Sequence, residues 1–86
     1  MSAFNVLDEK GIQLGELDEA CIVKFGQGLI QVNRSGLVSL VSALGNGWQE
    51  RMFWLQQDAV EYEGCRIVTQ SRIGATIGYV AEHRSP

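Results

Sequence analysis

The chain has 86 residues, 45% hydrophobic and 20% charged, with a single proline. This length and balance predict one globular domain over residues 1–86 with one modest core, and they exclude a disordered chain. Ten acidic residues outnumber seven basic ones, giving a formal net charge of −3. Since no basic stripe is present, we expect no nucleic-acid partner.

The first third of the chain has the composition of short strands joined by turns. Residues 15–19 are expected to be an acidic connection, and the apolar, β-branched run ACIVKF is the clearest strand. Gly26–Gly28 should turn the chain into a hairpin. The strand candidates in this part are residues 3–7, 12–14, 20–25 and 29–32.

Residues 35–45 predict the one helix of the chain. Its apolar positions repeat at i, i+3, i+4 and i+7, which places them on one face. Asn33 or Ser35 can cap the helix start, and Gly45–Gly47 can end it. The apolar face is formed by Leu37, Leu40, Val41 and Leu44, widened by Val38 and Ala43.

The opposite face of this helix carries serines, among them Ser39 and Ser42, and no residue from 35 to 49 is charged. A solvated helix face usually carries charged residues. We therefore expect this face to be covered by a second copy of the chain, a partner or a loop. A short surface helix with a polar, uncharged face is the alternative. The apolar run is far shorter than the ~20 residues that span a bilayer, so no membrane contact is expected.

Residues 48–57 (WQERMFWLQQ) predict a strand, because the segment is aromatic and follows a glycine break. Trp48, Met52 and Trp54 would share one face. Neither face is cleanly polar, which indicates that both sides meet something other than bulk water. A continued helix is the competing interpretation.

The last third predicts a second hairpin, in which residues 60–62 and 66–69 flank a turn at 63–65. Residues 74–81 should form the last strand and residues 82–86 a polar tail. Strands on both sides of a single helix indicate an α+β fold: a curved, mostly antiparallel sheet of five to six strands with the helix on one face. One helix cannot cover such a sheet, so curling or a partner must close the rest.

No motif in the chain carries a reaction. His83 has no ligand spacing with Cys21 and Cys65, so no metal and no cofactor are expected. Both cysteines are interpreted as reduced, partly buried thiols, although a disulfide between them stays open. The N-terminus lacks a basic and apolar leader, which predicts a cytoplasmic protein. Enzymatic activity is uncertain and less expected than binding, and no catalytic residue is proposed.

The aromatic residues of the C-terminal half are the strongest lead, because such side chains are enriched at interfaces and in pockets. The first hypothesis is a cytosolic, non-enzymatic interaction module that self-associates through the serine face and the 48–57 strand. The second is a small-molecule binding protein or simple enzyme with an aromatic pocket between helix and sheet. The candidate ligand or interface residues are Trp48, Met52, Trp54, Tyr62, Tyr79, Arg72, Ser39 and Ser42.

Overall fold

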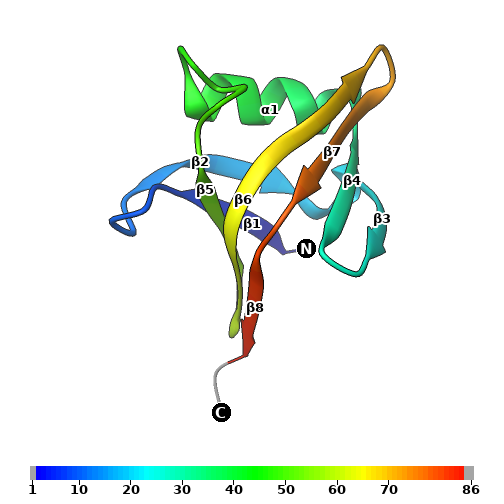
Figure 1. The fold of residues 1–86 in the computed structure, drawn as a ribbon. Coiled ribbons are helices and arrows are strands. Elements are labelled where there is room, and N and C mark those ends of the chain that lie inside the picture. Colours follow the sequence, from blue (N-terminus) through cyan, green and yellow to red (C-terminus); the bar gives the residue numbers. More distant parts are fainter. Residues whose placement is uncertain (1, 85–86) are drawn as a thin grey trace.

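A computed structural model describes residues 2–84. The fold is α+β: one α-helix and an antiparallel sheet of eight strands that is not closed (Figure 1). A 3₁₀ helix, η1, precedes the third strand. The elements are β1 (Ala3–Leu7), β2 (Gln13–Asp18), η1 (Glu19–Cys21), β3 (Ile22–Gly26), β4 (Leu29–Asn33), α1 (Arg34–Leu44), β5 (Phe53–Gln57), β6 (Val60–Ser71), β7 (Gly74–Gly78) and β8 (Ala81–Arg84).

The main path of the sheet runs β2-β1-β5-β6-β7-β4-β3, and β8 pairs with β6 beside this path. The 12-residue β6 is the longest strand. Its first half pairs with β5 and β8, and its second half pairs with β7. The expected fold class is confirmed, with eight strands where five or six were expected.

The predicted acidic connection at residues 15–19 was wrong, because most of this segment belongs to strand β2. β2 extends through Asp18 and pairs with β1 from Ala3↔Asp18 to Leu7↔Gln13. Leu17 is buried while its neighbour Glu16 is exposed, so the acids occupy the solvent side of a strand. Charged residues at alternate positions are compatible with a half-buried antiparallel strand.

The predicted hairpin at residues 63–65 was also wrong. Gly64 has φ 65°, and the chain passes through it without reversing. At this point β6 changes its partner strand: residues 60–63 pair with β8, and residues 66–71 pair with β7. The predicted last strand, residues 74–81, divides at Tyr79 and Val80. Its last residue, Ala81, forms β8 together with residues 82–84 of the expected polar tail. Residues 85–86 lie outside the described chain.

The predicted 48–57 strand is correct only from Phe53 onward. Before it, residues 46–50 form turns, in which Trp48 N–H donates to the Gly45 carbonyl at 3.2 Å. The Arg51 guanidinium donates to the Leu44 carbonyl at 2.8 Å and ties this loop to the end of the helix. The supposed face shared by Trp48 and Trp54 therefore does not exist as a strand face.

Helix α1 begins and ends at the expected signals. Asn33 Oδ1 accepts a hydrogen bond from Gly36 N–H at 2.9 Å, and Gly45, with φ 73°, donates back to the Val41 carbonyl. Its buried residues are Gly36, Leu40 and Leu44. Val38 is 58% exposed, so the prediction that it widens the core face was wrong.

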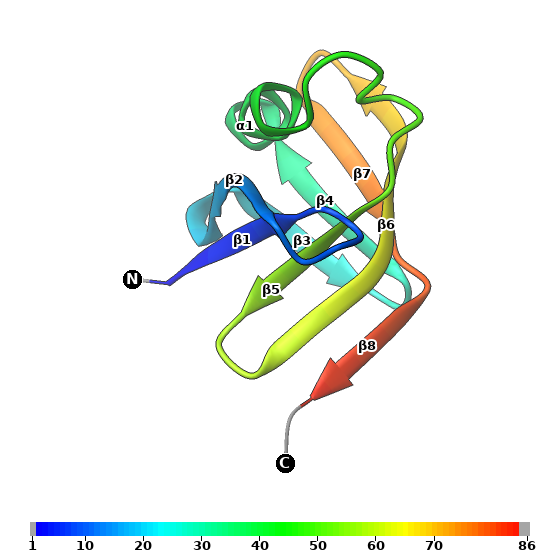
Figure 2. The same cartoon turned by 90° about the vertical axis from the view of Figure 1, so that its left-hand side faces the viewer.

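The helix contacts β2 at one edge of the sheet and both β4 and β7 near the other edge. Figures 1 and 2 show it lying across one end of the curled sheet. At Gly15 of β2 an added Cβ would lie 2.8 Å from Ala43 Cβ, so the absent side chain lets helix and strand approach. Curling of the sheet thus brings β2, β4 and β7 to the helix, while the sheet itself stays open.

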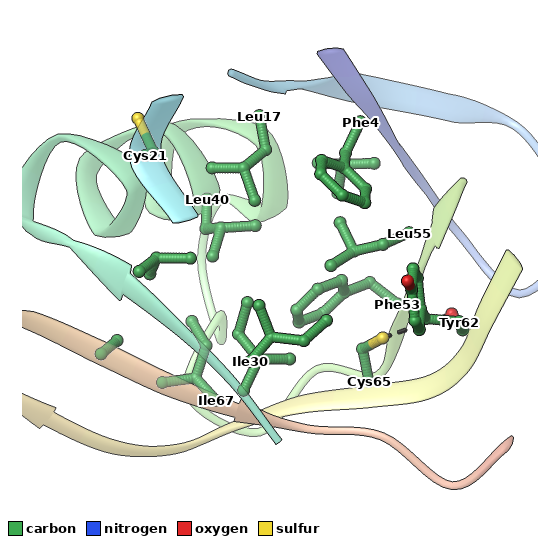
Figure 3. Packing of buried hydrophobic residues seen from close by; sticks show 14 of the residues in the cluster. Phe4, Leu17, Cys21, Ile30, Leu40, Phe53, Leu55, Tyr62, Cys65 and Ile67 are labelled. Atoms are coloured by element: carbon green, nitrogen blue, oxygen red, sulfur yellow. Dashed lines mark hydrogen bonds between the residues drawn. The ribbon is translucent and has the colours of Figure 1, made fainter. Parts of the chain in front are cut away.

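The core fills the space enclosed by the curled sheet and the helix. Leu17, Leu40, Ile30, Phe53 and Leu55 are fully buried and come from four different elements (Figure 3). None of the buried residues in the described chain is polar or charged. The interior is therefore a hydrophobic core.

Candidate interaction surface

The potential metal ligands and the two thiols are the groups whose reactivity the sequence left to be examined. Within residues 2–84, no group of three or more His, Cys, Asp or Glu residues could hold a metal ion. Cys21 and Cys65 are free and buried. Burial raises the pKa of Cys65 to about 12, and burial together with the nearby Asp18 charge raises the pKa of Cys21. Both thiols are consequently poor nucleophiles near neutral pH.

The part of the chain that the structure describes contains no helix with the length and apolar character needed to cross a membrane.

The most apolar cleft lies on the outer side of α1. We call it the Trp48 surface and define it by Leu37, Val38, Val41, Ser42 and Trp48. Its volume is about 330 Å³, and Arg34 and Gln70 complete its lining. Arg34 is the one charged side chain among the lining residues. The surface therefore offers a partner mostly hydrocarbon.

Two local features place Trp48 beside the helix. The glycines that end α1 let the chain fold back, and the Arg51 bond to Leu44 holds the returning loop. Trp48 also borders a shallow cleft along β6, where Val68 is 54% exposed. Trp48 thus lines both the cleft beside the helix and the cleft along β6, and it also packs against the hydrophobic core.

The two predicted serine residues line one cleft beside β2. Ser39 is half-buried and Ser42 is exposed, and both border this cleft with Leu14 and Glu16 of β2. Ser42 also borders the Trp48 surface. β2 therefore borders part of the serine face, which the sequence expected to be covered.

The other predicted residues are dispersed. Arg72 lies in the exposed turn between β6 and β7, where its carbonyl accepts a hydrogen bond from the Arg34 guanidinium at 3.1 Å. Trp54 is half-buried opposite Leu7, since Phe53 and Leu55 occupy the inner face of β5. Met52 is half-buried just before that strand.

Tyr62 and Tyr79 are two of the candidate residues, and the structure brings them together. Their ring centroids are 5.1 Å apart in an edge-on arrangement, and the ring of Phe25 lies 5.9 Å from that of Tyr62. Burial raises the pKa of Tyr62, and the Glu82 charge adds to the effect. These rings border a cleft of about 470 Å³ with Gly26, Gln27, Glu82 and Arg84.

The aromatic residues expected to line one pocket, Trp48, Trp54, Tyr62 and Tyr79, do not all come together, although the two tyrosines do. Trp48 and the tyrosine pair line different clefts, and Trp54 lines neither of them. Sequence reasoning missed the outward orientation of Val38. A usable signal existed, because Gly36, Leu40, Ala43 and Leu44 also follow helical spacing and define the face that is buried.

No protein-family model, no curated protein and no solved structure matches this chain.

Proposed function

We propose that this protein is a non-enzymatic interaction module that self-associates through the Trp48 surface. The observation that carries the proposal is the exposure of Val38, at 58%, at the centre of an almost uncharged helix side. An exposed helix face normally carries charges, whereas contiguous exposed apolar patches mark interaction sites. Burying one such valine completely contributes about 1.5–3 kcal/mol.

A second copy of the chain suits this surface because the surface has little charge. In a two-fold contact the same patch meets itself, so a patch with several like charges would repel its copy. Here the surface has one guanidinium, that of Arg34, and it already donates to the Arg72 carbonyl. Trp48 and Val38 of one copy could then pack against Val38 and Trp48 of the other.

The cellular setting that fits the proposal is the cytoplasm. The two free cysteines support it, since reduced thiols persist in that compartment. The alternative, a small-molecule site lined by aromatic side chains, has less support because Trp48, Trp54 and the tyrosine pair lie apart. Enzymatic activity has less support still, given the raised thiol pKa values.

Replacement of Val38 by glutamate tests the proposal. Val38→Glu puts a charge at the centre of the surface, and the molar mass from light scattering after size exclusion should fall by at least half. Ile12→Glu is the matched control: Ile12 is 60% exposed in the β1–β2 turn, and the wild-type mass should persist. A wild-type protein that is already monomeric, or an assembly that tolerates Val38→Glu, would refute self-association through this surface.

A further inference from the structure

Within residues 2–84, strand β8 is paired with another strand along one of its two edges. Its four residues pair with the first half of β6, from Val60↔Arg84 to Glu63↔Ala81. In the described chain no strand pairs with its other edge. A free edge presents unpaired backbone N–H and C=O groups that can join another strand.

The elements around β6 place β8 at the border of the sheet. β7 and β8 follow each other along the same side of β6, and β4 pairs with β7 on the far side. The tip of the β3–β4 hairpin reaches the junction between β7 and β8, where Tyr79 N–H donates to the Gly28 carbonyl at 2.9 Å. In Figure 1, β8 continues below this tip with no strand beyond it. The tyrosine-lined cleft of about 470 Å³ opens at this position.

The charges of β8 are arranged to complement a copy of the same strand. Its sequence is Ala81-Glu82-His83-Arg84, and Glu82 and Arg84 are on the inner face with Tyr62. In an antiparallel pair centred on His83, each Glu82 lies directly opposite an Arg84 of the other copy. Centring the pair on Glu82 or Arg84 instead would place like charges opposite each other. Opposite charges in directly facing positions stabilise a strand pair, and like charges destabilise it.

The side chains of β8 are free to form these contacts. Arg84 donates to Glu82 of its own strand at 2.8 Å, and its side chain is 74% exposed. His83 lies on the other face and pairs with Glu63 at 2.7 Å, so it does not compete for Glu82 or Arg84. Pairing of two strands would therefore extend an existing ion pair into a ladder of four charges.

We propose that β8 pairs antiparallel with β8 of a second copy, about a two-fold axis at His83, and joins the two sheets edge to edge. This surface is separate from the Trp48 surface and goes beyond the function proposed above. A chain with both contacts can bind one copy at each, which yields assemblies larger than a dimer.

The test measures dimerisation by sedimentation equilibrium in the Val38→Glu background, where the Trp48 surface is disabled. This parent protein should form a dimer whose dissociation constant rises at least about tenfold with Glu82→Arg or with Arg84→Glu. The double variant Glu82→Arg/Arg84→Glu restores both opposite-charge pairs, and its dissociation constant should return to near the parent value. Glu16→Arg, on the exposed side of β2, is the charge control and should leave dimerisation unchanged.

Mixing provides the sharpest readout. The Glu82→Arg and Arg84→Glu variants should each be monomeric alone and should form a mixed dimer when combined, because their charges then oppose correctly. Circular dichroism of each variant establishes that its sheet is intact. A monomeric parent, single variants that dimerise as the parent does, or a mixture that stays monomeric would each overturn the inference. These outcomes are all measured within the Val38→Glu background, whereas the test of the Trp48 surface compares this variant with wild type. The proposal for β8 and the proposal for the Trp48 surface can therefore be refuted independently.

Discussion

Gly36→Ala is expected to destabilise the protein although it lies within a helix. Alanine is favoured over glycine in a helix by up to about 1 kcal/mol. Here, however, an added Cβ would lie 2.8 Å from Val32 Cβ and 3.0 Å from Cys21 Cβ. Both atoms are attached directly to the backbone of neighbouring elements, so no side-chain rotation can move them away.

The balance of the two effects gives the magnitude. Overpacking of a filled core costs about 1–3 kcal/mol, which exceeds the gain in helix propensity. The expected net loss is about 1 kcal/mol in the free energy of unfolding, within a total of roughly 4–13 kcal/mol for a chain of this length. The thermal midpoint should fall by about 4–8 °C.

Urea unfolding followed by tryptophan fluorescence measures this change, with the m-value held as a check that the two end states are unaltered. Ser35→Ala, at the exposed position before Gly36, is the control and should stay within about 0.5 kcal/mol of wild type. If Gly36→Ala were more stable than wild type, the close packing of α1 against β4 and η1 would be refuted.

Two further predictions concern the helix cap and the buried thiol. Asn33→Ala removes the acceptor for Gly36 N–H and should lower the free energy of unfolding in urea by about 1 kcal/mol. Asn33→Asp keeps an acceptor at this position and should largely retain the wild-type stability. Equal stability of the alanine and aspartate variants would contradict the capping role. Burial raises the pKa of Cys65 from 9.0 to about 12, so the folded state holds the thiol proton more tightly than the unfolded state. The contribution of this thiol to the free energy of unfolding is complete below pH 9. It should be lost as the pH rises toward about 12, by up to about 1.4 kcal/mol per pH unit. In Cys65→Ala the free energy of unfolding should fall less steeply with pH in this range, and an unchanged pH dependence would contradict the role of the buried thiol.

Local signals of the helix could be interpreted correctly from sequence, because they act over a few residues. Asn33 and Gly45 mark its ends, and both adopt the geometry that their residue types favour. The outward orientation of Val38 could not be chosen in the same way. Two overlapping apolar stripes satisfy helical spacing, and the close approach of β2 at Gly15 decides which one is buried.

The strands show the same division. Composition alone does not separate an acidic loop from a charged edge strand. Residues 15–19 therefore suggested a connection, although Leu17 alternates with Glu16 and Asp18 as in a strand. Gly64 was interpreted as a turn, yet its positive φ serves a change of partner strands within β6. The division of β7 from β8 likewise follows from pairing with β6, which lies beyond any local window.

The sequence by itself determined the class of fold, the single helix with its caps, and the scarcity of charge along its outer side, since these depend on composition and on contacts near in the chain. Only the tertiary structure decided which aromatic side chains meet: it joined Tyr62 to Tyr79 and set Trp48 against the helix, apart from Trp54. Among residues 2–84, it also left one edge of β8 without a partner strand. Curling of the sheet brings distant segments together, and that curling results from the packing of the whole core.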